Sequence, residues 1–293
     1  MARHTQPFFI VSSGRSGTQM MEKLCKTFPQ VEMHHEYLCT HVQPLAVRYY
    51  LGLATLEEVA QTLEGLHGRA VRYSACPLWG DSSNKLSWLI EGLDAVFPNA
   101  RFVHLVRDGR KVVSSFFHKL GAECYDDQST GILQAHVDDP LANPAPPPEK
   151  KYWWTLPRPG TPLAQEFRGF SQFQRICHHW AEINRVILAG LGKLPRERWR
   201  TYKLEELVKD RGVLQDFLNF LGLPGHDHLF LLLQRPHNVH TPRDYPLSAA
   251  QMAQFMDLAG DMMAYFNYDQ ATEYQVIYDV KLPPCLEGGQ GLD

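Results

Sequence analysis

The sequence predicts an α/β fold in which helices flank a central parallel sheet. Residues 8–11 and 101–106 are short apolar runs with aromatic and β-branched side chains, and such runs are typical of buried parallel strands. The first run leads through glycines and serines into apolar residues at three- and four-residue spacing, the period of an amphipathic helix. Strand, turn and helix in this order form the unit of an α/β protein.

The two strands belong to two such units. In the first, the helix is expected over 20–28. In the second, a helix over 86–97 with one apolar face precedes the strand at 101–106, and a further helix is expected over 110–118.

The second half of the chain predicts more helices than strands. Helices are expected over 172–191 and 213–221, with a short strand at 199–202 between them. A last helix over 248–266 begins at Ser248, a residue type that caps helices. Its apolar stripe consists of Met252, Phe255, Met256 and Met263.

We expect one domain over residues 1–293, since this length fits one large domain. Residues 121–165 contain the proline-rich stretch 143–148 and predict a surface insertion or a lid. The glycine-rich tail, residues 285–293, is expected to be disordered.

Composition narrows the classes of function. The formal net charge of −3 and the lack of a basic run argue against nucleic-acid binding. No apolar stretch is long enough to cross a bilayer, and no signal peptide is recognisable. Six cysteines without a C-x-x-C pair indicate free thiols, a cytoplasmic location and no metal site. The sequence does not indicate an oligomeric state.

The turn after the first strand carries the first chemical motif. Small residues allow the backbone to wrap around an anion, and the amides at the start of the next helix point at it. Arg15 adds a permanent positive charge. The motif lacks the Lys-Ser/Thr pair of a Walker A loop, and a plain structural turn remains an alternative. It reads Ser13-Gly14-Arg15-Ser16-Gly17-Thr18-Gln19.

The second motif follows the strand at 101–106. Arg107 ends this strand, and Ser115 lies eight positions later in the expected helix. A strand-end arginine and a helical hydroxyl can converge on one phosphate group. The alternative is a structural ion pair of Arg107 with a carboxylate such as Asp108.

Together the two motifs resemble the sulfotransferases that use 3′-phosphoadenosine-5′-phosphosulfate (PAPS). The resemblance extends from residue 8 to about 268 and implies a P-loop-like sandwich. It implies that the loop residues Gly14, Arg15, Ser16, Gly17, Thr18 and Gln19 bind the 5′-phosphosulfate. It also implies that Arg107 and Ser115 bind the 3′-phosphate, that the product is 3′-phosphoadenosine-5′-phosphate (PAP), and that no metal is needed.

Three positions depart from the pattern of this family. Gln19 and Gly109 stand where many members have a hydroxyl residue and a proline. A lysine expected within residues 79–84 is absent, unless Lys85 replaces it.

Glu36 is the candidate general base. It lies 21 residues after Arg15, and in the tyrosylprotein-type members that the chain resembles a glutamate at this interval has that role. His34 and His35 are alternatives, because imidazole titrates nearer neutrality. A structural role for all three residues is the remaining interpretation.

We therefore expect transfer of a sulfuryl group from PAPS to a hydroxyl or amine of a small molecule, such as a natural product. The acceptor is assigned to two segments interpreted as loops, 37–80 and 121–170, which are rich in aromatic residues. Acidic residues in the second segment hint at a cationic acceptor, although a solvated acidic loop is the simpler interpretation. They are Asp126, Asp127, Asp138 and Asp139.

Other interpretations stay open. The chain is alternatively a P-loop-type small-molecule kinase, a non-catalytic phosphoadenosine-binding protein, or a protein with a structural role. In the late polar loop, Arg243 is a candidate phosphate contact. The cluster at residues 177–180 is interpreted as packing rather than as a metal site.

Overall fold

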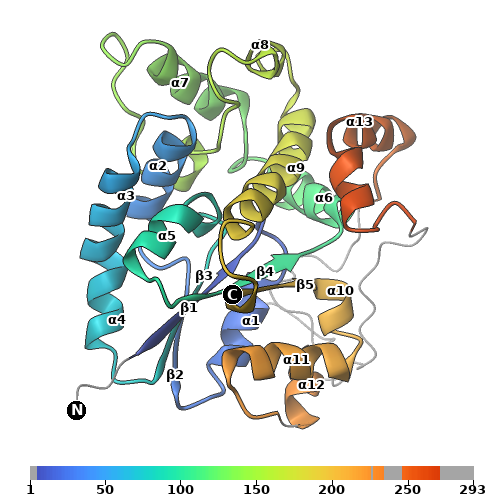
Figure 1. Ribbon diagram of the computed structural model, residues 1–293. Coiled ribbons are helices and arrows are strands. Elements are labelled where there is room, and N and C mark those ends of the chain that lie inside the picture. Colours follow the sequence, from blue (N-terminus) through green and yellow to red (C-terminus); the bar gives the residue numbers. More distant parts are fainter. Residues whose placement is uncertain (1–4, 226, 234–245, 271–293) are drawn as a thin grey trace, which may run out of the picture.

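The computed structural model describes residues 5–225, 227–233 and 246–270 (Figure 1). Its centre is a sheet of five strands in the order β2-β3-β1-β4-β5, and every pairing is parallel. The predicted α/β class with a central parallel sheet is therefore confirmed. The strands are β1 (Gln6–Val11), β2 (Val31–His35), β3 (Leu78–Ser82), β4 (Arg101–Val106) and β5 (Trp199–Lys203).

Helices cover both faces of the sheet, because side chains alternate along each strand. In β1, Phe8 and Ile10 pack into one apolar cluster and Phe9 and Val11 into the other. The smaller cluster lies under four helices, drawn in the lower part of Figure 1. They are α1 (Thr18–Cys25), α10 (Leu204–Leu207), α11 (Arg211–Leu221) and α12 (Asp227–Leu233).

The larger cluster lies on the opposite face and is crossed by the long helix α9 (Figure 1). Its α-helices are α2 (Cys39–Tyr50), α3 (Leu56–Leu63), α4 (Arg69–Tyr73), α5 (Ile90–Val96), α6 (Gly109–Lys119), α7 (Asp127–Asp138), α8 (Pro162–Phe167), α9 (Gln172–Leu191) and α13 (Ala249–Tyr265). Short 3₁₀ and π turns are η1 (Glu64–Gly68), η2 (Leu86–Trp88), η3 (Lys150–Tyr152) and η4 (Arg196–Arg198).

Several predicted elements are confirmed. The strand at 101–106 and the helix at 172–191 have the predicted bounds. The Ser248 hydroxyl accepts a hydrogen bond from the Gln251 amide and caps α13. In that helix the expectation for Met256 was wrong, because its side chain is 39% exposed.

The helix predicted over 86–97 is interrupted. A 3₁₀ turn occupies its start, and Leu89 has backbone angles outside the helical region (φ −119°, ψ 21°) before α5 begins. The apolar spacing continues through the break, so periodicity alone did not reveal it.

The interpretation of residues 37–80 as loops was wrong. This segment forms α2, α3, α4 and the start of β3, a strand between β2 and β1 in the sheet. Proline at position 44 lowered the helical signal of α2, yet Val42, Ala46 and Val47 are buried in the core and hold the helix in place. Packing therefore outweighed local propensity.

Strand β3 was missed because its sequence, Leu78–Ser82, is not an apolar run. It includes Gly80, where a Cβ atom would lie 2.3 Å from the Phe8 ring and 2.6 Å from the Met33 sulfur. The glycine thus allows side chains from both neighbouring strands to pack over the sheet.

Residues 121–165 are only partly irregular. They contain α7, η3 and most of α8, and Trp153 and Trp154 are buried in the larger cluster. The expected tail at 285–293 lies outside the described residues. Within the described ranges, no helix has the length and apolar character needed to span a membrane.

Candidate active site

The loop between β1 and α1 has the backbone of an anion-binding turn. Gly14, Arg15 and Gly17 all have positive φ angles, of 84°, 54° and 91°. Gly17 precedes α1 without a capping side chain, so the first amides of this helix are left for another acceptor. Successive amides in such a turn form a concave site for an anion.

Two serine hydroxyls of this loop form hydrogen bonds with its own backbone. The Ser12 hydroxyl accepts a hydrogen bond from the Gly14 amide at 3.1 Å. The Ser16 hydroxyl is buried and donates to the Gly14 carbonyl at 3.1 Å. Ser16 can therefore offer a ligand its amide, while its side chain stabilises the turn.

Two glycines are required by close neighbours. A Cβ atom on Gly14 would lie 2.9 Å from the Asn84 side-chain nitrogen, and one on Gly17 would lie 2.9 Å from Leu204. Thr18 and Gln19 occupy the first turn of α1, which begins two residues before the predicted start at residue 20.

The two sequence motifs meet at Arg15. Its Nε donates to the Ser115 hydroxyl at 3.0 Å, and the Arg107 guanidinium donates to the Arg15 carbonyl at 2.9 Å. Residues about 100 positions apart in the sequence are thereby brought to one edge of the sheet, beyond the carboxyl ends of β1 and β4.

Among the described residues, Arg107 has no carboxylate partner of the kind considered as an alternative. Asp108 instead pairs with Arg110 at 2.6 Å and caps α6 through the Arg110 amide. The Nε of Arg107 is buried and has no hydrogen-bond partner in the described part of the chain.

Arg15 and Arg107 therefore place two positive charges together. Burial lowers the pKa of Arg15, and the charge of Arg107 lowers it further. No ion pair joins either guanidinium to a carboxylate among residues 5–225, 227–233 and 246–270. An anionic ligand would relieve this repulsion and satisfy the buried Nε.

Glu36 lies where β2 ends. Its backbone has a φ of 54°, and its amide donates to the Ser82 carbonyl at 3.1 Å. The carboxylate forms ion pairs with Lys150 and, at 3.8 Å, with Lys85. Burial alone would raise the pKa of Glu36, but the two ammonium groups outweigh it and lower the pKa to about 2. Glu36 is thus ionised at neutral pH and weakly basic in this arrangement.

His35 and His34 lie on opposite sides of β2. The Nδ1 of His35 lies 2.9 Å from the Ser82 carbonyl oxygen, which only accepts, so Nδ1 is the donor in this contact. His34 instead pairs with Glu32 at 3.0 Å and stacks against Trp79. Of the two histidines proposed as alternative bases, His35 is the one electrostatically coupled to Glu36.

Lys85 is a buried cation at this site. Its side chain is 6% exposed, and its ammonium lies 5.0 Å above the Trp154 ring. Burial lowers the pKa of Lys85, although Glu36 partly offsets this effect. The sequence marked Lys85 only as a substitute for a missing lysine, and the structure positions it beside Glu36.

Lys150 had no sequence signal. It lies in the segment interpreted as an insertion or lid, and its contact with Glu36 spans 114 positions. Gln43 of α2 donates to the carbonyls of Lys150, at 3.1 Å, and Trp153, at 2.6 Å. These contacts hold residues 150–153 over the end of β2.

The acidic residues of the 121–170 segment have structural partners. Asp127 pairs with Arg175 and Asp138 with Arg168. Asp126 caps α7, and Asp139 accepts from the amides of residues 141 and 142. Their arrangement therefore gives no support to a cationic acceptor.

The cluster at residues 177–180 consists of side chains that pack and form hydrogen bonds. His179 lies between the Tyr125 hydroxyl and the Ser13 carbonyl, each 3.2 Å away, and His178 packs against Phe167. No group of three potential metal ligands occurs in the part of the chain that the structure describes. Arg243 lies outside the described residues.

No protein-family model and no curated protein matches the chain. Solved sulfotransferase structures are similar to it over most of its length. The sulfotransferase domain of the Synechococcus PCC 7002 olefin synthase is 17% identical, with 92% of this chain and 97% of that chain covered and a TM-score of 0.46.

Two further sulfotransferases give similar values. For the sulfotransferase domain from the curacin biosynthetic pathway, the identity is 17%, the coverage 87% of this chain and 98% of that chain, and the TM-score 0.44. For the sulfotransferase from Alicyclobacillus acidocaldarius, the identity is 14%, the coverage 90% of this chain and 92% of that chain, and the TM-score 0.44. A likeness of this size assigns neither an activity nor residue roles to this chain.

Proposed function

We propose that the protein is a PAPS-dependent sulfotransferase that acts on a small molecule. The observation that carries the proposal is the meeting of Arg15, Arg107 and Ser115. It brings two guanidinium groups beside the loop after β1, in which Gly14, Arg15 and Gly17 have positive φ angles. PAPS carries anionic groups at both its 5′ and its 3′ positions, and a site built from two separate motifs suits such a ligand.

The residues present fit this ligand. The loop amides and Arg15 would hold the 5′-phosphosulfate, and Arg107 with Ser115 would hold the 3′-phosphate. The buried, unpartnered Nε of Arg107 is the hydrogen-bond donor that such an anion would satisfy.

The donor supplies the sulfuryl group. The acceptor oxygen or nitrogen forms the new bond to sulfur while the bond from sulfur to the 5′-phosphate oxygen breaks, and its electron pair stays on that oxygen. Arg15 and the loop amides stabilise the charge that develops there. The proton of the acceptor passes to a base on the protein.

Glu36 is our first candidate for this base, because its carboxylate is ionised and lies at the same edge of the sheet. Its ion pair with Lys150 must loosen for it to accept a proton readily. His35 is the second candidate, since the contact of its Nδ1 with the Ser82 carbonyl fixes the ring and leaves Nε2 as the nitrogen that could face an acceptor.

A small-molecule kinase is the rival activity. A P-loop kinase places a lysine before the hydroxyl residue of its loop to reach the phosphates, whereas this chain has Gly17 before Thr18. The loop sequence therefore favours the sulfotransferase. A non-catalytic phosphoadenosine-binding protein would bind PAP and transfer nothing.

Several finer points belong to the same proposal. We infer one catalytic domain over 1–293 and a role in making natural products. The five cysteines in the described residues are free thiols, which is consistent with a cytoplasmic protein.

Calorimetric titration with PAP and, separately, with ATP and Mg²⁺ tests the proposal. We expect PAP to bind in the micromolar range and ATP to bind far more weakly. Arg107→Ala and Ser115→Ala should each weaken PAP binding by about tenfold or more. A preference for ATP with Mg²⁺ would support the kinase instead, and the absence of PAP binding would exclude the proposed donor.

A further inference from the structure

A buried carboxylate and a buried imidazole meet beside the carboxyl end of β2. The side chains of Asp81, in β3, and His67, in the π turn η1, are both fully buried, and Oδ2 of Asp81 lies 3.5 Å from Nε2 of His67. This distance is within ion-pair range but long for a hydrogen bond. Within the described residues, neither that oxygen nor either ring nitrogen has a hydrogen-bond partner. Single π turns frequently occur at functional sites.

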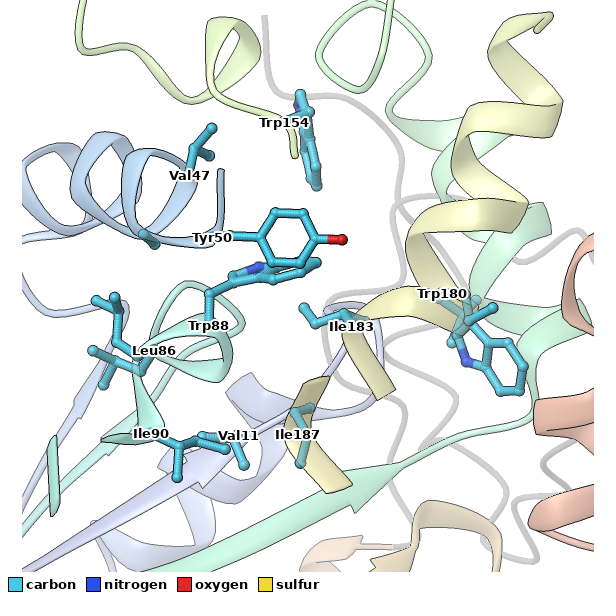
Figure 2. Close-up of a cluster of buried hydrophobic side chains, with 14 of the residues drawn as sticks. Val11, Val47, Tyr50, Leu86, Trp88, Ile90, Trp154, Trp180, Ile183 and Ile187 are labelled. Carbon is cyan, nitrogen blue, oxygen red and sulfur yellow. The ribbon is translucent and has the colours of Figure 1, made fainter. Parts of the chain in front are cut away.

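The surroundings of this pair are otherwise apolar. Asp81 lies opposite Phe9 of β1 in the sheet, and Phe9 packs into the larger cluster. Figure 2 shows another part of that cluster, in which Tyr50 and Trp88 pack among aliphatic side chains. Burial of polar groups among apolar side chains is costly, so the Asp81–His67 pair requires an explanation beyond the filling of space.

The other oxygen of Asp81 holds the turn that follows β2. The Oδ1 atom accepts a hydrogen bond from the Tyr37 amide at 3.3 Å. One position earlier, the Glu36 amide donates to the Ser82 carbonyl at 3.1 Å. Two consecutive amides are thus bound by two consecutive residues of β3. The backbone bond continues the pairing of the strands, whereas the side-chain bond depends on which residue stands at position 81.

This turn has a backbone that needs such an anchor. Glu36 and Leu38 have positive φ angles of 54° and 49°, although neither is a glycine. Conformations of this kind persist only where the surroundings impose them. The ring of Tyr37 lies edge-on to the rings of His67 and Trp79, with centroids 5.4 Å and 5.5 Å away. Tyr37 is therefore held both through its amide and through its ring.

We infer that Asp81 and His67 are positioning residues for Glu36. Asp81 fixes the turn through the Tyr37 amide, and His67 holds the Asp81 carboxylate and packs against the Tyr37 ring. Both side chains are fully buried, so they act through Glu36 rather than on a substrate. The inference rests on the proposed function only in giving Glu36 a task in catalysis.

The direction of the Glu36 side chain decides which cations it meets. Its carboxylate pairs with Lys85, whose side chain is buried, and with Lys150 of the segment that covers the end of β2. A turn released from Asp81 would let the carboxylate move away from both ammonium groups, and the pKa of Glu36 would then rise from about 2 toward 4.5. The pKa of Glu36 therefore reports the position of its carboxylate.

Two variants of Asp81 separate its hydrogen bond from its charge. Asp81→Asn and Asp81→Leu both remove the carboxylate and introduce side chains of similar size. Asparagine keeps an oxygen that can accept from the Tyr37 amide, whereas leucine has no acceptor. Any difference between the two variants therefore belongs to the hydrogen bond and not to the lost charge.

The readouts are the pKa of Glu36, from carbon-13 NMR of glutamate-labelled protein, and the rate of hydrogen exchange at the Tyr37 amide. We expect Asp81→Leu to raise this pKa by about one unit and to speed the exchange by about tenfold. Asp81→Asn should retain most of the wild-type behaviour in both. PAP binding, measured by calorimetry, should be the same in the two variants. Because neither NMR readout uses PAPS, a failure to bind PAP would refute the proposed function and leave this result standing.

His67→Phe tests the second member of the pair, since phenylalanine keeps a ring against Tyr37. Alone, this variant leaves the Asp81 carboxylate buried without a partner and should lower the urea midpoint of unfolding. In the Asp81→Asn background the same change should lower the midpoint much less. Equal losses in both backgrounds would show that the two side chains do not interact.

Two results would overturn the inference. One is the same Glu36 pKa in Asp81→Asn and Asp81→Leu, which would reduce Asp81 to a packing residue. The other is fast exchange of the Tyr37 amide in the unchanged protein, which would show that the turn is not held. The second measurement needs no variant, so it decides the matter even if Asp81→Leu fails to fold.

Discussion

Replacing Lys150 with methionine removes the charge partner of Glu36 and keeps most of the aliphatic chain. The two lysines lower the pKa of Glu36 from 4.5 to about 2, and together they stabilise the folded state by roughly 3 kcal/mol at neutral pH. Lys150 is 46% exposed, so solvent screens its share, which we place at about 0.5–1 kcal/mol. The variant should therefore raise the pKa of Glu36 by about 0.5.

The sign of the pH dependence follows from the lowered pKa. The unfolded chain binds a proton at Glu36 near pH 4.5, whereas the folded protein does so only near pH 2. The stabilisation is therefore complete above pH 4.5 and is lost as the pH falls through 2. The free energy of unfolding of Lys150→Met should therefore stay below that of the unchanged protein down to about pH 3, and the difference should vanish only near pH 2.

Two measurements check this prediction. Carbon-13 NMR of glutamate-labelled protein reports the pKa of Glu36, and urea unfolding reports the free energy of unfolding at pH 7 and pH 3. Lys151→Met, next in the chain and exposed, is the matched control. If the two variants have the same Glu36 pKa, the ion pair does not exist in solution and the reasoning fails.

Three further predictions concern the anion site and the base. Gly14→Ala should lower the free energy of unfolding by about 1–3 kcal/mol, measured in urea, because the position has positive φ and no room for a Cβ; an unchanged stability would contradict the loop geometry. Arg107→Lys should weaken PAP binding in calorimetry despite the conserved charge, since a lysine lacks the second nitrogen of the fork; wild-type affinity would show that charge alone suffices. Glu36→Gln should reduce the rate of sulfuryl transfer by about 10²-fold or more with PAP binding retained, and a larger loss in His35→Asn would assign the base to His35.

Much of the fold was predictable because its signals are local. The apolar run 101–106 required a buried strand, and the structure has β4 at those residues. The glycines and serines within residues 12–17 predicted a tight turn, and Gly14, Arg15 and Gly17 have positive φ angles. A turn's dihedral angles depend on the residues that form it, so the sequence alone sufficed.

The strands β2 and β3 and the helix α2 were not predicted, because their local sequences are not typical of the elements that they form. β2 and β3 carry His34, His35, Asp81 and Ser82 at or near their carboxyl ends, so neither strand is a continuous apolar run. Their strand character comes from pairing with β1 and with each other. α2 contains a proline and is held by its buried face.

The sequence by itself determined the α/β class and the tight turn after β1, and it singled out Arg15, Arg107 and Ser115 as candidates. Only the tertiary structure decided that Arg15 rather than Arg107 bonds Ser115, and that Lys85 and Lys150 flank Glu36. The physical reason is the sequence separation of the residues that decide each feature. Backbone dihedral angles and helix faces follow from neighbouring residues, whereas a contact across 100 or 114 positions exists only when separate elements pack on one sheet.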